Sequence, residues 1–332
     1  FTDNSLVGTV AFTAPTATYA GGTLSGQLSY YVMVGNDTLA TGKTYPGAFV
    51  RETVTVPEGV TTFRVTTANE VGSSPENKVK VYVGNDEPTQ VKDVNLAIDP
   101  ETGVAKLTWS PVTTGINGGY IGNITYNVVR YPDSTTVATG LAATEFTETF
   151  SAEEPLQTYS YGVAAVNDTQ TGVAGISNKS VFGAAIVPPY SEPLDNEGAL
   201  ELYTIIDNNE DGSTWEFNEK EGAASYKYSR VNDGDDWLIT PAIQLKGGKL
   251  YSVSFETCGY GYTYHERIEV KYGNQPTVAG MTHQLLDSTD IMSPNYTKFT
   301  REIAADTDQK VYVGFHAISP ADEFRLYLKN VE

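Results

Sequence analysis

The sequence contains very little cysteine, which limits how the fold can be held together. Cys258 is the single cysteine among 332 residues, so an intrachain disulfide is excluded. It follows Phe255 in a strand-like pattern, and no motif places a histidine beside it. We therefore expect Cys258 to be a small buried hydrophobic residue rather than a reactive thiol.

Basic residues are also scarce. The chain has 21 Lys and Arg against 41 Asp and Glu, a formal net charge of −20. Nucleic acid and anionic membranes need a basic face, so we expect neither as a partner. The excess of acidic residues either keeps the protein soluble or provides carboxylate-rich Ca²⁺ sites. No stretch approaches the ~20 apolar residues that span a bilayer. No signal peptide is recognisable, and we interpret Phe1 as the start of a processed or trimmed chain.

The sequence lacks the short motifs that mark common catalytic sites. It has no H-E-x-x-H, G-x-S-x-G or P-loop pattern, and His265, His283 and His316 share no metal-ligand spacing. A carboxylate pair for glycoside hydrolysis stays open, because such pairs are distant in the chain. We expect no enzymatic activity, with a carbohydrate-active enzyme module as the weaker alternative.

What the chain does have is a pattern of short strands. Charged residues make up only 19%, whereas glycine (31) and tyrosine (22) are abundant, and this composition favours strands and turns. Apolar and polar residues alternate in 104–109, 124–130 and 159–167, with Gly, Pro, Asn and Asp at the breaks. About seven short strands in ~100 residues predict a β-sandwich over residues 88–187.

This segment carries the order L-T-W-x-P, Y-x-V-x-R and Y-x-Y-x-V-x-A-V-N, which resembles fibronectin type III domains. The resemblance implies that Trp109 lies in the core on the second strand. It also implies that Tyr159 is the corner tyrosine, its hydroxyl bonded to nearby backbone. Residues 1–87 repeat the pattern weakly. Thr61 stands at the corner position and little sequence precedes Val7, so this domain either lacks its first strand or begins inside it.

Residues 188–332 carry ordered motifs of their own. The order is D-x-N-x-D-G-x-x-W from Asp207, D-D-W-L-I-T-P-x-I-x-L from Asp235, and G-x-x-Y-x-x-S-F from Gly248. It resembles the cleaved-adhesin family, also called choice-of-anchor J, over roughly residues 189–332. Members are jelly-roll modules of Bacteroidetes surface and secreted proteins, including gingipain haemagglutinin regions. The resemblance implies adhesion rather than catalysis.

Proline-bearing joints and strand alternation together predict the architecture. The joints near residues 87 and 188 divide the chain into domains 1–87, 88–187 and 188–332. We predict an all-β protein of two immunoglobulin-like (fibronectin type III) sandwiches followed by a C-terminal jelly-roll β-sandwich. Less than about a fifth of the residues should be helical, against an ordinary third.

The motif at Asp207 is a candidate calcium site. Ca²⁺ takes six to eight oxygen ligands, and Asp207, Asn209 and Asp211 present oxygens at alternate positions before a glycine. An EF-hand is rejected, because position twelve is an asparagine and no helices flank the loop. Members of the resembling family bind structural Ca²⁺. The alternative is an Asx-turn loop with solvated carboxylates. Asp235 and Asp236 form a second acidic turn that either contributes ligands or is plain surface.

Aromatic residues offer candidate contacts to a ligand. Tyr260, Tyr262 and Tyr264 alternate in a loop-like, glycine-containing run, and aromatic faces pack on the C–H patches of sugars. The alternative is that these tyrosines line one face of a sheet. Trp215 and Trp237 lie within strand motifs, so we expect them in the core.

Together these patterns favour a non-catalytic adhesin. Two fibronectin-like spacers would present a Ca²⁺-stabilised jelly roll that binds a glycan or a host or matrix protein. The alternative is a purely structural arm of a larger surface protein. We expect an exported monomer, either attached to the cell surface or secreted.

Overall fold

The fold is built almost entirely from β-strands. The computed structural model describes Phe1 and residues 3–332, with 52% of residues in strands and 3% in helices. This confirms the all-β prediction. Within the described residues, no helix is both long and apolar enough to cross a membrane.

The chain forms two compact units. Unit 1 comprises Phe1–Asn95, Thr108–Phe146 and Tyr161–Ser177, and unit 2 comprises Leu96–Leu107, Thr147–Ser160 and Asn178–Glu332. The two sheets of residues 88–187 thus fall largely into different units. The three-domain division at residues 87 and 188 stays a prediction.

The described residues of 1–87 form two antiparallel sheets, one with strand order β3-β2-β5-β6 and one made of β1 and β4. The larger sheet buries alternate residues such as Tyr30 and Val32 of β2, as expected for a strand with one inward face. The strands are β1 (Val7–Thr13), β2 (Leu28–Val34), β3 (Asp37–Thr44), β4 (Phe49–Thr55), β5 (Gly59–Ala68) and β6 (Asn77–Val83).

Residues 88–187 again supply two sheets, ordered β10-β9-β12-β13, with β14 also pairing β12, and β11-β8-β7. The second sheet therefore has one strand, β7, more than its counterpart in residues 1–87. The strands are β7 (Asn95–Ile98), β8 (Val104–Thr108), β9 (Thr125–Tyr131), β10 (Thr135–Leu141), β11 (Glu145–Thr149), β12 (Gln157–Val166), β13 (Gly175–Ile176) and β14 (Ser180–Phe182).

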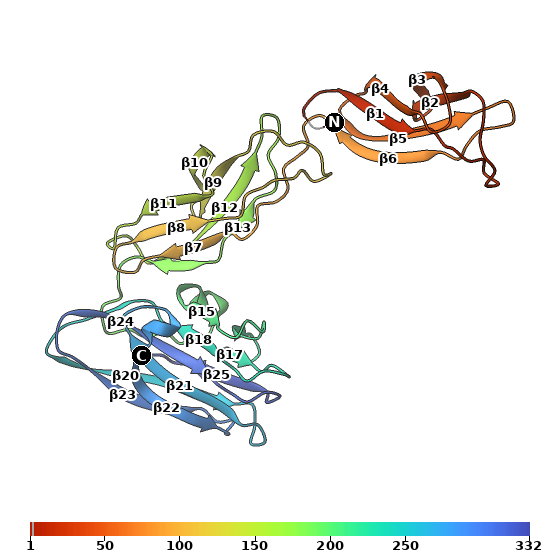
Figure 1. Ribbon diagram of the computed structural model, residues 1–332. Helices are drawn as coiled ribbons and strands as arrows, with labels where there is room; N and C mark the ends of the chain where they lie inside the picture. Colours follow the sequence, from red (N-terminus) through yellow and green to blue (C-terminus); the bar gives the residue numbers. More distant parts are fainter. Residues whose placement is uncertain (2) are drawn as a thin grey trace. The chain divides into compact units, whose positions relative to one another are not determined.

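Residues 188–332 form two sheets with the orders β15-β18-β24-β21-β22 and β16-β17-β25-β20-β23, and β19 also pairs with β24 (Figure 1). One apolar core includes residues of both sheets, as expected for a jelly roll. The elements are η1 (Glu197–Leu202), β15 (Thr204–Asp207), β16 (Trp215–Asn218), β17 (Ala223–Lys227), β18 (Asp236–Ile239), β19 (Ile243–Leu245), β20 (Lys249–Gly259), β21 (Glu266–Gly273), η2 (Val278–Gly280), β22 (His283–Ile291), β23 (Thr297–Ala305), β24 (Gln309–Ala317) and β25 (Arg325–Lys329).

The large aromatic residues lie mostly inside, as their strand motifs predict. Trp109 follows directly after β8 and packs edge-on against Tyr126, with ring centroids 5.3 Å apart. The Tyr159 hydroxyl accepts a hydrogen bond from Gln157 Nε2 at 2.8 Å. Trp215 and Trp237 are each 2% exposed, and Cys258 is buried. Burial raises the pKa of the Cys258 thiol to about 11, which keeps it protonated.

A buried aspartate anchors the segment that follows β6. Asp86 is fully buried, and its carboxylate accepts bonds from the backbone N–H groups of Asn117 (2.8 Å) and Gly119 (2.9 Å) and from Asn117 Nδ2 (2.9 Å). A Cβ on Gly115 would lie 2.3 Å from Asp86 Oδ2, so only glycine allows this close approach.

Replacing Asp86 by alanine is expected to destabilise unit 1 by about 3 kcal/mol, because three hydrogen bonds to a buried carboxylate are lost. Asp168→Ala, at an exposed position, is the matched control and should change stability by less than about 0.5 kcal/mol. Chemical denaturation of the two variants measures the difference. If the two variants unfolded at the same denaturant concentration, the hydrogen bonds to Asp86 would contribute nothing net to the free energy of unfolding.

Candidate functional site

The predicted calcium motif is a tight loop between β15 and β16. The carboxylate of Asp207 accepts bonds from the backbone N–H of Asp211 at 3.2 Å and of Gly212 at 2.8 Å. The Asp211 carboxylate accepts from the N–H of Ser213 at 2.8 Å. Asn209 Nδ2 donates a hydrogen bond to the Asp233 carbonyl at 2.9 Å. The loop therefore brings Asp207, Asn209 and Asp211 together, with their oxygens oriented by backbone donors.

The two aspartates of the second acidic turn have different environments. Asp236 pairs with Asp207 across β18 and β15 and is fully buried. Asp235 precedes the strand and points to its other side, where its carboxylate accepts from Asn208 Nδ2 at 2.6 Å. Because successive side chains of a strand point to opposite faces, Asp236 is the one that joins the Asp207 loop.

The carboxylate of Asp236 lies in an unfavourable environment for a negative charge. Its Oδ1 has no hydrogen-bond partner among the described residues. Burial raises the pKa of the Asp236 carboxyl to about 7; a bond from the Asp235 N–H opposes this rise, and the charges of Asp207 and Asp211 add to it. The nearby Tyr226 hydroxyl is also buried without a partner, and burial together with Asp236 raises its pKa.

These oxygens are of the type that a hard cation binds, but their arrangement does not form a complete metal site. Carboxylates of Asp207, Asp211 and Asp236 are the ligands that Ca²⁺ prefers, and an unpartnered buried oxygen is stabilised by a cation. In the described part of the chain, however, no three His, Cys, Asp or Glu side chains are placed so that they could hold a metal ion. Binding would require these carboxylates to move closer to one another.

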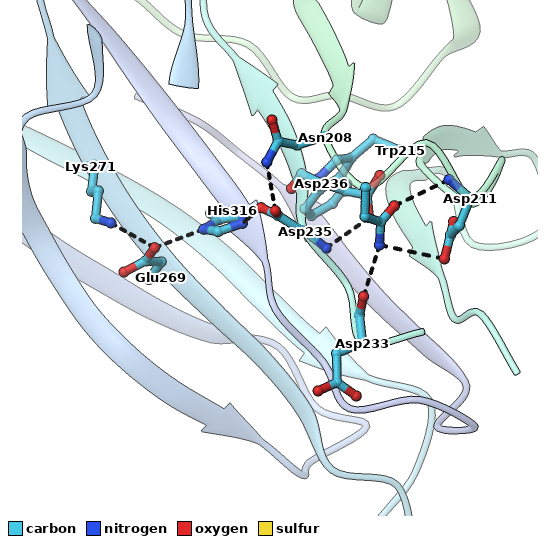
Figure 2. A network of polar contacts seen from close by, with 10 residues as sticks. Asn208, Asp211, Trp215, Asp233, Asp235, Asp236, Glu269, Lys271 and His316 are labelled. Atoms are coloured by element: carbon cyan, nitrogen blue, oxygen red, sulfur yellow. Dashed lines mark hydrogen bonds and ion pairs between the residues drawn. The ribbon is translucent and has the colours of Figure 1, made fainter. Parts of the chain in front are cut away.

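A second polar network lies on the other side of Asp235. His316 Nε2 is 2.7 Å from Asp235 Oδ1, and His316 Nδ1 is 2.7 Å from Glu269 Oε1. Lys271 Nζ donates to the same Glu269 oxygen at 2.8 Å (Figure 2). Each ring nitrogen of His316 therefore lies within hydrogen-bond distance of a carboxylate oxygen from a different strand or loop.

The network is held against a buried indole. The His316 ring stacks on Trp237, with centroids 4.0 Å apart and planes 14° apart, and Lys271 Nζ lies 5.7 Å from the centre of the Trp237 ring. The Lys271 cation thus faces the electron-rich indole. Trp237, His316 and Glu269 are register partners across β18, β24 and β21. The sequence analysis missed this network, because only the pairing of distant strands brings these residues together.

Two tyrosines of the predicted run, Tyr260 and Tyr264, belong to a partly exposed aromatic cluster. Tyr260 and Tyr264 contact Phe324, with centroids 4.3 Å and 5.4 Å away, and Phe324 also stacks on Tyr228 at 5.9 Å. Tyr260 is 48% exposed and Tyr262 is 66% exposed. The Tyr262 hydroxyl accepts a bond from Asn295 Nδ2 at 3.3 Å rather than joining the Phe324 contacts. We call Tyr228, Tyr260, Tyr264 and Phe324 the aromatic cluster.

A polar groove runs between the aromatic cluster and the Asp207 loop. Its volume is about 440 Å³, and its lining includes Ser213, Glu216, Tyr228 and Arg230. Tyr228 therefore belongs to both the groove and the cluster. The groove offers hydroxyl, carboxylate and guanidinium groups beside flat aromatic faces.

Comparison with known proteins finds similarity in solved structures only. No protein-family model matches the chain, and no curated protein sequence matches it. The K1 cleaved adhesin domain of Lys-gingipain from Porphyromonas gingivalis W83 is 21% identical, with a TM-score of 0.36 over 43% of this chain and 95% of that one. A xylan-binding domain from Paenibacillus barcinonensis is 8% identical, with a TM-score of 0.30 over 43% and 90%.

The same comparison also finds fibronectin-type structures. The FN1–FN3 domains of chicken CNTN1 are 12% identical, with a TM-score of 0.28 over 98% of this chain and 95% of that one. A Fn3-like protein from Clostridium thermocellum is 25% identical, with a TM-score of 0.21 over 30% and 92%. The solved structures that match this chain thus include cleaved-adhesin domains and fibronectin type III domains, the two families that its sequence resembles.

Proposed function

We propose that residues 188–332 form a non-catalytic module that binds carbohydrate at the aromatic cluster and the adjoining polar groove. The observation that carries this proposal is the contact of exposed Tyr260 with Tyr264 and Phe324. Phe324 in turn stacks on Tyr228, which lines that groove. In this proposal the chain is part of an exported surface adhesin, and residues 1–187 act as spacers.

The chemistry of the two surfaces supports a sugar ligand. Sugar rings present C–H patches that pack on aromatic faces, and their hydroxyls need donors and acceptors of the kind that line the groove. Arg325 adds a fixed polar group, because its Nη1 bonds Glu216 Oε1 and Ser225 Oγ, each at 2.9 Å. A single site of this size would bind on the order of 0.1–1 mM, and several copies on one surface would add avidity.

Tyr260→Ala is expected to reduce glycan binding at least tenfold, because it removes an exposed stacking face. Tyr264→Ala should have a similar effect, and Tyr262→Ala a smaller one, since Tyr262 lies outside the Phe324 contacts. Tyr19→Ala is the matched control, because Tyr19 is 95% exposed in residues 1–87. The measurement is a glycan array followed by calorimetry on the best ligand.

Two results would contradict this proposal. Glycan binding that all the tyrosine variants retain would place the site elsewhere. Absence of binding to glycans and to matrix proteins would leave the structural-arm alternative as the better description of the chain.

We further propose that Ca²⁺ stabilises the Asp207 loop. The support is the buried, unpartnered Asp236 Oδ1 beside two further carboxylates. An ion that binds only the folded state raises its stability by mass action. Millimolar Ca²⁺ should therefore raise the melting temperature of EDTA-treated protein, and Asp207→Ala should abolish the increase.

Mg²⁺ is the matched control for this measurement, since it demands smaller, octahedral sites and should have little effect. Asp287→Ala, at an exposed position on β22, should retain the response to Ca²⁺. An unchanged melting temperature in Ca²⁺ would rule out the ion.

A further inference from the structure

The polar groove beside the aromatic cluster has an excess of positive charge. Its lining includes two exposed cations, Lys227 at the end of β17 and Arg230 in the loop that follows. The carboxylate that lines the groove, Glu216, bonds Arg325 Nη1 at 2.9 Å. Because Arg325 offsets the charge of Glu216, the lining residues leave the positive charges of Lys227 and Arg230 uncompensated.

Lys227 and Arg230 also lack the carboxylate partners that some other exposed lysines have. Lys246 and Lys298, for comparison, lie 2.7 Å and 2.9 Å from a carboxylate oxygen. Within the described part of the chain, neither Lys227 nor Arg230 forms an ion pair. Asp and Glu outnumber Lys and Arg by 41 to 21, so a shortage of carboxylates does not explain these two unpaired cations.

The strand register connects these cations to the aromatic cluster. Lys227 of β17 lies directly opposite Arg325 of β25, and opposite side chains of an antiparallel pair project from the same face. Like charges in this arrangement destabilise a sheet, which an anion bound beside them would relieve. On the next strand, the backbone N–H of Tyr260 donates to the Arg325 carbonyl at 3.1 Å. Cations and an exposed aromatic ring therefore lie on neighbouring strands.

We propose that the groove binds an anionic saccharide, whose carboxylate or sulfate group is bound by Lys227 and Arg230 while a sugar ring packs on the aromatic cluster. This inference rests on the proposed carbohydrate-binding function and names the class of ligand. The planar fork of an arginine matches two oxygens of a carboxylate or sulfate, and a lysine supplies a point charge. Ser213 and Ser229 of the same lining offer hydroxyl groups to the neutral part of the sugar.

The net charge of the chain limits how many negative charges this ligand carries. At −20, the protein repels an extended polyanion, and the cations of one groove do not offset that repulsion along many charges. A single acidic group is favoured, because its attraction to the two cations acts at short range, whereas salt screens its repulsion by distant carboxylates. The groove therefore suits a glycan with an isolated uronic acid, sialic acid or sulfate group.

The test uses the full chain on an array of matched glycan pairs. Uronic-acid and sialic-acid glycans are paired with their methyl esters, and sulfated glycans with the unsulfated forms, so each pair differs in charge. We expect the acidic member of at least one pair to bind about tenfold more tightly than its neutral partner, as measured by calorimetry. Preference within the carboxylate pairs or within the sulfate pairs identifies the anionic group.

The double variant Lys227→Gln/Arg230→Gln should abolish the difference in affinity between the two members of a pair. Lys220→Gln/Lys249→Gln is the matched control, because it removes the same charge at exposed lysines outside the groove lining. This control should keep the preference for the acidic member. Equal melting temperatures of the two double variants show that the comparison reports binding and not folding.

Several results would overturn this inference. If neutral glycans bind as tightly as their acidic partners, the inference fails and the proposed carbohydrate binding stands. The inference also fails if Lys227→Gln/Arg230→Gln keeps the preference, or if the control variant loses it. If neither acidic nor neutral glycans bind, this inference and the proposed function both fail. Tyr260→Ala should weaken both members of a pair, which separates the aromatic contribution from that of the cations.

Discussion

Metal-free protein is expected to lose stability in unit 2 as the pH rises from about 4 to about 7. The cause is Asp236, whose carboxyl is buried among other acids and has a folded-state pKa of about 7 against an ordinary value of 3.8. A carboxyl with a raised folded-state pKa favours the folded state while protonated. This stabilisation is complete below the pKa that the carboxyl has in the unfolded state. It is lost as the pH rises through the pKa that the carboxyl has in the folded state.

The size of this effect follows from the shift. Each pKa unit corresponds to about 1.4 kcal/mol, so the three-unit shift of Asp236 allows up to about 4 kcal/mol. Asp236→Asn removes the titrating group and keeps the shape, so it should flatten the pH dependence and stabilise the protein at neutral pH in EDTA. Chemical denaturation at a series of pH values measures both effects.

Asp287→Asn serves as the control, because this exposed residue lies far along the chain from the Asp207 loop. It should preserve the pH dependence of the parent protein. If Asp236→Asn showed the same slope as the parent, the burial of a titrating carboxyl at this position would be the wrong explanation.

His316→Ala is expected to destabilise unit 2 by about 2–3 kcal/mol, because it removes two hydrogen bonds to carboxylates and a stacked ring. His316 lies between Asp235 and Glu269, and its side chain is only 11% exposed. Without it, the two carboxylates lose their shared hydrogen-bond partner, and the face of Trp237 loses its stacked ring. The free energy of unfolding from denaturant titration is the measurement.

His265→Ala is the matched control, since His265 is an exposed histidine just before β21. It should change stability by less than about 0.5 kcal/mol. A loss of under about 1 kcal/mol in His316→Ala would mean that the network contributes little beyond a surface ion pair.

The all-β class and the burial of the tryptophans could be predicted from sequence. Alternation of apolar and polar residues is a local property with a period of two, and it marks the inward face of a strand directly. The strand motifs that contain Trp215 and Trp237 predict their burial, and the fibronectin resemblance implies that of Trp109. All three are buried. The clustering of Asp207, Asn209 and Asp211 also follows from their closeness in one loop.

The partners of the acidic turn depend on tertiary structure. Asp235 and Asp236 look equivalent in the sequence, yet one bonds His316 and the other is buried beside Asp207. A shift of one residue in the pairing of β18 would exchange their faces. Only the register between strands that are distant in the chain decides which carboxylate is exposed and which is buried.

By itself, the sequence determined the strand content, the inward faces and the loops that carry candidate ligands, because each depends on neighbours within a few residues. The tertiary structure decided which faces meet. It joined Phe324 to the tyrosine run, stacked His316 on Trp237, and placed Lys227 opposite Arg325. These features depend on strand order and register, which are set by the packing of whole sheets and are not encoded in any local pattern.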